Sequence, residues 1–417
     1  MVDPDLSIAE RTTNGLHRAV SQTDAMLVII EPPTGQRQSQ GFEWRTALSM
    51  GKPIFPLLTF GHYSEIPEEL AHFQAIDFRP ERSYDRGFAE LIAALRELGA
   101  LRESGIVRIL HLSDLMVDGK GLPETKMPFE RLADSMRVES SAGRKPDLIA
   151  ITGDVALTGS ADEYRLAQRY INEQLLGALE PFDATRVLIV PGNHDVDRRK
   201  VDLPKFEALS DRVRRNGQSA IEAFWRGTSA EIVRNTQEAF LEFSSAFAPF
   251  QLSPSGWGTN ISINGVSVGI ARLSSAWLTF SPVGDDIAMV GEFLAREAFS
   301  RLSGAELKIA LIHHPPERLD LFDHTELLAV LKRERCAVLM HGHVHAQERG
   351  PKEGETLLVG ATGFSSGSRT ANFNLLEIDL PENEVRVFPY VWDQRSRRWI
   401  HADMRSNELF SEPQRQR

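Results

Sequence analysis

Residues 187–195 of this 417-residue chain read VLIVPGNHD, an apolar run that leads directly into polar residues. Short apolar runs that end at turn residues are typical of buried β-strands. The polar end supplies an amide oxygen at Asn193, an imidazole at His194 and a carboxylate at Asp195. Proteins use these groups to bind divalent metal ions and to transfer protons. The stretch therefore predicts a buried strand whose C-terminal end carries reactive side chains.

Four other predicted strands end in residues of the same kinds. Parallel strands bring their C-terminal ends to one edge of a sheet, so we expect these side chains to converge in one crevice. Carboxylate, amide and imidazole donors suit Mn, Fe, Zn or Ni, and the motifs contain no thiolate. One such motif alone is more often a turn or a satisfied polar pair, whereas five at strand ends indicate a metal centre. The other strands and the residues that follow them are 106–112 with Asp114, 148–152 with Asp154, 309–312 with His313 and His314, and 337–340 with His343 and His345.

These motifs make residues 106–400 clearly similar to the calcineurin-like metallophosphoesterases. The resemblance implies a four-layer αββα sandwich, in which two mixed sheets are flanked by helices and a pair of divalent metal ions lies at the strand ends. It also implies a hydrolase that acts on phosphoester bonds. The motifs that carry the resemblance are HLSD at 111–114, GD at 153–154, GNHD at 192–195, HHPP at 313–316 and GHVH at 342–345.

The resemblance also implies a role for each motif residue. His194 stabilises the transition state or protonates the leaving oxygen, and Asp195 orients His194. Two cations bridged by one carboxylate lower the pKa of a shared water and neutralise the charge that develops on a phosphoryl group. The implied ligands are Asp154 as the bridge, Asn193, His313 and His343 on one metal, and Asp114 and His345 on the other.

One position departs from the family pattern. The first motif of the family is Asp-x-His, whereas this chain has Asp-Leu-Met at 114–116. The thioether of Met116 is a soft ligand and matches an oxygen-rich Mn, Fe or Zn site poorly. Three protein ligands plus water can still hold a metal. We therefore expect the metal held by Asp114 and His345 to be weakly or selectively bound, with slow turnover.

Residues 1–102 form a separate unit in which predicted helices and strands alternate, as in a parallel sheet with helices on its faces. This unit resembles a bacterial TIR (Toll/interleukin-1 receptor) domain, which has a small flavodoxin-like α/β fold. The first strand and first helix of that family have no counterpart before Ser7. The segments that carry the resemblance are SQTDAMLVIIEP at 21–32, EWRTALSMGKPIFPLL at 43–58 and IPEELAHFQAIDF at 66–78.

The TIR resemblance marks one candidate catalytic residue. In TIR domains that cleave NAD, a glutamate opens a Glu-x-x-x-Ala helix, and Glu43 occupies that position ahead of Ala47. A carboxylate there stabilises a cation-like ribosyl centre, as carboxylates do in glycoside hydrolysis. The alternative, which we favour, is a first-turn helix residue that interacts with the helix dipole. TIR domains also associate with one another, so a second TIR surface is an expected partner.

The remaining organisation follows from composition along the chain. Residues 103–402 are expected to form the phosphoesterase-like domain, with a mostly helical insertion at about 201–250. An Asn-Gly pair at 264–265 and the stretch PENE at 381–384 predict two hairpins. The last residues, 403–417, are polar and predict a frayed tail.

Overall composition places further limits on function. The formal net charge is −11, which argues against loose electrostatic binding to nucleic acid or to an anionic membrane. No apolar run approaches the roughly 18 residues of a membrane span, and the start lacks a signal-peptide pattern. The single cysteine, Cys336, cannot form an internal disulfide. We therefore expect a cytoplasmic protein.

Three functions remain as hypotheses. The first is a metal-dependent phosphoesterase, acting on phosphomonoesters or phosphodiesters and regulated or localised by the TIR-like module. The second is a signalling or scaffold protein that binds a phosphorylated ligand without hydrolysing it, which Met116 favours. The third is an NAD hydrolase that uses Glu43. The sequence leaves open whether the phosphoester substrate is a nucleotide, a nucleic acid or a phosphoprotein.

Overall fold

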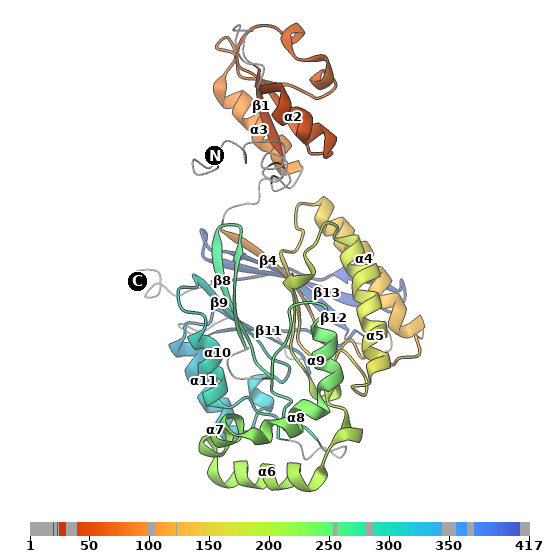
Figure 1. Ribbon diagram of the computed structural model, residues 1–417, viewed down its shortest axis with the longest axis vertical. Helices are drawn as coiled ribbons and strands as arrows, with labels where there is room; N and C mark the ends of the chain where they lie inside the picture. Colours follow the sequence, from red (N-terminus) through yellow and green to blue (C-terminus); the bar gives the residue numbers. More distant parts are fainter. Residues whose placement is uncertain are drawn as a thin grey trace. The chain divides into compact units, whose positions relative to one another are not determined.

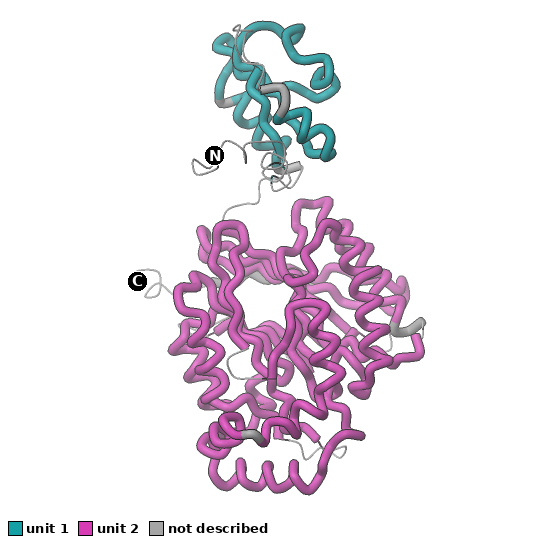
Figure 2. Tube along the Cα trace, in the orientation of Figure 1, with its two compact units in different colours: residues 1–102 teal, residues 103–417 magenta. Residues whose placement is uncertain are grey.

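The chain divides into two compact units in the computed structural model, residues 1–102 (unit 1) and 103–417 (unit 2), as Figure 2 shows. Within the described part, no helix is both long and apolar enough to cross a lipid bilayer. The structure describes residues 20, 23, 25–30, 40–97, 105–121, 123–252, 257–280, 287–343, 356–364 and 371–408.

Unit 1 contains a parallel three-stranded sheet whose strands follow one another in chain order. One face of its first described helix packs on this sheet, because Trp44 and Ala47 are buried while Glu43 and Arg45 are exposed. The helix predicted at 7–20 lies almost wholly outside the described residues. The elements are β1 (Met26–Ile30), α2 (Gln40–Ser49), β2 (Ile54–Leu58), β3 (Ile76–Asp77) and α3 (Tyr84–Glu97).

The first sheet of unit 2 has seven strands, in the order β14-β13-β12-β4-β5-β6, with β15 also paired to β13, and it is mixed. Strands β4, β5 and β6 are parallel, whereas β12 runs antiparallel to both β4 and β13. The bounds are β4 (Ile106–Leu112), β5 (Leu148–Ile151), β6 (Val187–Ile189), β12 (Asn372–Asp379), β13 (Glu384–Asp393), β14 (Arg398–His401) and β15 (Arg405–Glu408).

The second sheet of unit 2 has five strands in the order β11-β10-β9-β8-β7. Strands β8 to β11 are parallel, and β7 pairs with β8 as the hairpin predicted from the Asn-Gly pair at 264–265. Both central residues of that turn have positive φ, which suits asparagine and glycine. The bounds are β7 (Gly258–Ile263), β8 (Val266–Arg272), β9 (Leu307–Leu311), β10 (Val338–His341) and β11 (Leu357–Gly360).

Helices cover the outer faces of both sheets. Figure 1 shows α4 and α5 beside the seven-stranded sheet and α10 and α11 beside β8 and β9. A single buried apolar cluster joins the inner faces of the two sheets. The predicted four-layer αββα sandwich is therefore confirmed. The helices are α4 (Pro123–Ser141), α5 (Ala161–Tyr170), α10 (Glu292–Ser300) and α11 (Leu321–Arg333).

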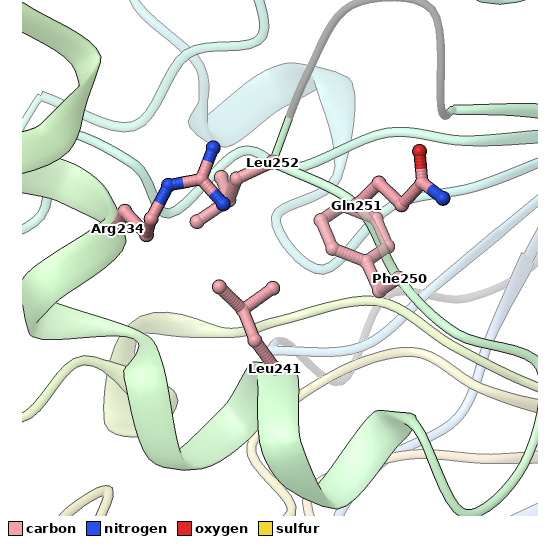
Figure 3. A pocket seen from close by; sticks show the side chains of 5 residues that line it. All are labelled: Arg234, Leu241, Phe250, Gln251 and Leu252. Atoms are coloured by element: carbon pink, nitrogen blue, oxygen red, sulfur yellow. The ribbon is translucent and has the colours of Figure 1, made fainter.

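Four further helices occupy the segment predicted as a helical insertion. They bury aromatic side chains such as Phe206, Phe224 and Phe240 against the core of unit 2. A small pocket of about 230 Å³ lies in this part of the unit (Figure 3) and is lined by residues 234, 241 and 250–252. The helices are α6 (Leu203–Asn216), α7 (Gln218–Arg226), α8 (Glu231–Thr236) and α9 (Glu238–Ser244).

The C-terminal segment differs from the expectation of a frayed tail at 403–417. Residues 405–408 form β15, which pairs antiparallel with residues 384–387 of β13. Strand β14 covers only residues 390–393 of the same edge, so the backbone groups next to it remain available for pairing. Polar side chains are tolerated on such an edge strand, and composition alone therefore did not reveal it. Residues 409–417 lie outside the described residues.

Candidate metal centre

The strand ends of both sheets in unit 2 bring the predicted metal-binding side chains together. Asp114, Asp154 and Asn193 follow β4, β5 and β6, and His313 and His343 follow β9 and β10 of the second sheet. Asp114, Asp154 and His343 have φ angles of 52°, 52° and 68°. Positive φ is uncommon outside glycine and is enriched for aspartate and histidine. Such strained residues cluster at functional sites, where the surrounding structure holds them in place.

His313 lies at the centre of this group and is fully buried. Its Nδ1 lies 2.7 Å from the carbonyl oxygen of Thr152, which can only accept a hydrogen bond, so Nδ1 carries the proton. Its Nε2 therefore faces Asp154 Oδ2 at 3.2 Å and Asn193 Oδ1 at 3.1 Å. With a neutral imidazole, three acceptor atoms converge on one point, as they do around a bound cation.

The electrostatics of the same residues also favour a cation. One ligand atom each from Asp114, Asp154 and His313 lies within 4.8 Å of the other two. Burial raises the pKa of the Asp114 carboxyl above its usual range, and the negative charge of Asp154 adds to this rise. Burial lowers the pKa of His313, but the Asp154 carboxylate outweighs this and raises it to about 9, so without a cation Nε2 carries a proton and donates it to Asp154. A bound cation would take the place of that proton, which leaves the imidazole neutral and its Nε2 an electron-pair donor. These donors fit a hard or borderline divalent cation, because such an ion neutralises two carboxylates that otherwise repel each other.

A second group of ligand atoms comes from three imidazoles, those of His313, His314 and His343. The His343 ring centroid lies 5.2 Å from that of His313 and 4.4 Å from that of His314. His314 Nδ1 lies 2.8 Å from Ser275 Oγ, and burial holds the pKa of His314 well below its usual range. The sequence favoured His313 as the ligand and did not place His314 beside His343. The adjacent histidines at 313 and 314 could have indicated a second ligand group. The contact with Ser275 could not have been predicted, because Ser275 is 39 residues away from His314.

His194 borders the metal-binding group through its backbone. Its amide donates a hydrogen bond to Asp154 Oδ1 at 2.8 Å, and its ring Nδ1 lies 2.8 Å from the carbonyl oxygen of Leu157. The carbonyl requires a proton on Nδ1, so Nε2 is the ring atom that is free to exchange a proton. His194 also lines a pocket of about 340 Å³. His194 is thus held between the carboxylate of Asp154 and an open cavity.

Asp195 has different partners from those expected. Its carboxylate accepts hydrogen bonds from the amides of Gly192 and Ala156 and, at 2.8 Å, from the hydroxyl of Tyr164. Burial and the nearby charge of Asp154 raise its pKa to about 6. Asp195 therefore links the loop after β6 to the loop after β5. The Leu157 carbonyl, and not Asp195, orients the His194 ring. The sequence did not reveal this, because the partners come from three separate segments.

Two glycines allow the loops to approach closely. A Cβ atom on Gly342 would lie 2.6 Å from Asp114 Oδ2, and one on Gly192 would lie 2.6 Å from the backbone nitrogen of Asp154. Both distances are shorter than real Cβ contacts. The glycines of the GNHD and GHVH motifs are therefore required by packing around the two aspartates.

We expect Gly192→Ala to destabilise unit 2 and to displace Asp154. Overpacking of a well-packed site typically costs about 1–3 kcal/mol of the free energy of unfolding. Urea unfolding measures this loss. Gly177→Ala is the matched control, because its added Cβ would meet only an oxygen at 3.8 Å. Equal stability of the Gly192→Ala variant and the wild type would contradict the close approach of these loops.

The remaining predicted residues are placed as follows. Met116 is half-buried with a φ of 50°, and its amide donates a hydrogen bond to the carbonyl oxygen of Asp154 at 3.0 Å. The position at which the family pattern has a histidine thus lies in a loop bonded to that of Asp154. His345 lies outside the described residues. Glu43 is exposed in the first turn of α2 in unit 1, where it interacts favourably with the helix dipole.

Several solved structures resemble this chain at low sequence identity. An anchor protein of the inner membrane complex of Plasmodium is 12% identical over 74% of this chain and 90% of that chain, with a TM-score of 0.39. A dimetal phosphatase from Danio rerio is 10% identical over 73% and 99%, with a TM-score of 0.40. A predicted phosphoesterase from Streptococcus pneumoniae is 12% identical over 73% and 98%, with a TM-score of 0.31. These likenesses say nothing about the activity of this chain.

Family models give a clear assignment. The model of the calcineurin-like phosphoesterases matches residues 107–347, which is more than half of the chain. The model of the TIR domain matches residues 1–92. No curated protein matches the chain. Together with the strand-end motifs, these matches show that the chain belongs to the calcineurin-like phosphoesterase family and carries a TIR domain at its N-terminal side.

Proposed function

We propose that this chain is a metal-dependent hydrolase of phosphomonoesters or phosphodiesters. The approach of Asp154 Oδ2 and Asn193 Oδ1 to His313 Nε2, at 3.2 Å and 3.1 Å, carries this proposal. Asp114 and Asp154 supply the negative charge that binds divalent cations, with Mn, Fe, Zn and Ni as the candidates. In this proposal Asn193, His313 and His343 would hold one cation, Asp114 and His345 would hold the other, and Asp154 would contribute to both.

The residues of this chain have distinct roles in the proposed reaction. Bound divalent cations supply an activated water and offset the charge that develops on the phosphoryl group. Asp154 and His313 hold the site in place, because each is buried and each contacts the other. His194 keeps one ring proton on Nδ1, directed at the Leu157 carbonyl. In its imidazolium form Nε2 carries a second proton, and the ring gives this proton to the leaving oxygen and returns to the neutral state. Asp195 positions the loop that carries His194.

One panel of substrates tests the proposal. Purified protein with Mn²⁺ is incubated with bis-p-nitrophenyl phosphate, cyclic nucleotides, DNA and NAD. Phosphoester turnover that is lost in Asp154→Asn supports the proposed function. NAD consumption that is lost in Glu43→Ala supports an NAD hydrolase instead, with unit 2 as its sensor.

We expect Mn²⁺ to raise the midpoint of thermal unfolding of the wild type, and EDTA to reverse the rise. A ligand that binds only the folded state at a hundred times its dissociation constant stabilises it by about 2.7 kcal/mol. Differential scanning fluorimetry measures the shift without requiring turnover. The Asp154→Asn variant should show no rise, and a rise of equal size in that variant would contradict a metal at this carboxylate.

A second candidate function is a signalling protein that binds a phosphorylated ligand without hydrolysing it. Met116 favours this candidate, because a thioether replaces an imidazole beside Asp154. Binding of a phosphorylated ligand in the presence of Mn²⁺, with no turnover of any substrate in the panel, would support it. For either function, we propose that the TIR domain regulates or localises the protein, with a second TIR surface as its partner. A reducing compartment such as the cytoplasm suits Cys336, a buried free thiol.

A further inference from the structure

The pocket beside His194 has the size of a small-molecule site. Its volume of about 340 Å³ lies at the lower end of the range of roughly 300–1,000 Å³ found for such sites. Its walls are formed by the two loops that follow β5 and β6, with Leu157 and Thr158 from the first and Val196 from the second. The pocket thus combines apolar surface with polar groups next to the proposed proton donor.

Three charged residues line the pocket and leave one positive charge without a partner. Asp197 is buried, and its carboxylate accepts hydrogen bonds from Arg199 Nε at 2.8 Å and from Nη2 at 3.0 Å. This bidentate pair neutralises two of the three charges. Arg198 is exposed and forms no ion pair with an acidic side chain in the described part of the chain. In a protein with a formal charge of −11, an unpaired guanidinium in a pocket wall supplies a local positive charge that attracts anions.

The orientation of His194 relates this pocket to the metal-binding group. The His194 amide is bonded to Asp154 Oδ1, whereas its imidazole is bonded to the carbonyl of Leu157, and both His194 and Leu157 line the pocket. In the proposed reaction, this imidazole protonates the leaving oxygen. The remainder of the leaving group is attached to that oxygen, and because His194 lines the pocket, it can extend into this cavity.

We propose that this pocket binds the leaving group of the substrate, and that Arg198 selects leaving groups that carry a second negative charge. The substrate class is then a phosphoester whose leaving group joins an apolar body, which contacts Leu157 and Val196, to a phosphate or carboxylate. The Asp197–Arg199 pair stabilises the short segment that carries Arg198, which lines the pocket. This inference rests on the proposed function, because it assigns a leaving group to the pocket.

Two matched esters test the inference. The wild type with Mn²⁺ should hydrolyse 4-carboxyphenyl phosphate with a higher kcat/KM than phenyl phosphate. The quantity to compare is the ratio of kcat/KM for 4-carboxyphenyl phosphate to kcat/KM for phenyl phosphate. A charge-assisted hydrogen bond to the carboxylate should raise this ratio by about tenfold. Arg198→Gln should therefore lower the ratio by about tenfold, and Arg198→Lys should lower it by less. Comparing the ratio between variants cancels the intrinsic difference in reactivity of the two esters.

Lys200→Gln is the matched control, because Lys200 belongs to the same short segment but pairs with Glu238 at 2.7 Å. It should leave the ratio unchanged. Equal ratios in the wild type and in Arg198→Gln would overturn the role of Arg198.

A binding experiment separates this inference from the proposed function. Calorimetry with phenylphosphonate and 4-carboxyphenylphosphonate in the presence of Mn²⁺ measures affinity without turnover. Selective weakening of the carboxylated phosphonate in Arg198→Gln, with no hydrolysis of either ester, would support the pocket and overturn the hydrolase. Hydrolysis of both esters with no effect of Arg198→Gln on either measurement would overturn the pocket alone. Absence of both binding and hydrolysis would overturn both proposals.

Discussion

Replacing Asp154 by asparagine is expected to weaken Mn²⁺ binding and phosphoester hydrolysis by at least about 100-fold. Replacing a residue that only contacts a metal ligand typically lowers metal affinity or activity about 10–100-fold. Replacing a carboxylate that is itself a shared ligand should lower them further. Asp154 is only 2% exposed and faces both His313 Nε2 and the His194 amide. Asparagine preserves the size of the side chain but removes its negative charge. Calorimetric titration with Mn²⁺ and turnover of bis-p-nitrophenyl phosphate measure the two losses.

A matched control for this variant is Asp134→Asn. Asp134 is exposed on α4 and pairs with Arg131 and Arg137 at 3.0 Å, a surface arrangement that contributes little to stability. This variant should bind Mn²⁺ and hydrolyse substrate as the wild type does. Unchanged Mn²⁺ affinity in a folded Asp154→Asn protein would remove the basis for a metal centre at these strand ends.

Met116→His is expected to produce the largest gain of function in this chain. The new imidazole would lie in a loop whose backbone is bonded to the carbonyl oxygen of Asp154, the residue assigned as the shared ligand. Histidine also tolerates the positive φ of this position, 50°, better than most residues do, so the substitution should not unfold the loop. We expect the bound Mn²⁺ to rise toward two ions per chain and the affinity of the weaker site to increase by about tenfold or more, which is about 1.4 kcal/mol.

Met116→Leu controls for the removal of the thioether without the addition of a ligand. It should leave metal content and turnover of bis-p-nitrophenyl phosphate close to those of the wild type. If Met116→His changes neither quantity, another group already completes the shell around this cation. If Met116→Leu lowers metal content, the methionine sulfur is itself a ligand, contrary to our interpretation.

Much of the fold could be predicted from local sequence. The apolar run predicted as a strand over 106–112 coincides with β4, and the strand predicted over 148–152 forms β5 with one residue fewer. These runs are buried on both faces of their sheet, so they are almost continuously apolar and are visible without any knowledge of their neighbours. The segment 405–408 was missed for the opposite reason, because its polar residues lie on an edge strand and leave no apolar pattern.

The candidate site was predictable only as a set of residue types at strand ends. The positions of Asp154 and His313 after their strands follow from the sequence, since a parallel strand delivers the residue that follows it to the edge of the sheet. The partners of these residues did not follow. Tyr164 binds Asp195, and Ser275 binds His314, through contacts that join segments 31 and 39 residues apart. No local pattern records such pairs.

The sequence by itself determined the family, the two-unit organisation and the identity of the donor groups, because motif spacing and apolar periodicity are properties of short segments. Only the tertiary structure decided which atom each donor faces. His313 Nε2 faces Asp154 and Asn193, and Asp195 faces backbone amides in place of the His194 ring. The physical reason is that hydrogen bonding and electrostatic attraction depend on distances of a few ångströms between segments from two sheets, and these distances exist only after both sheets have packed together.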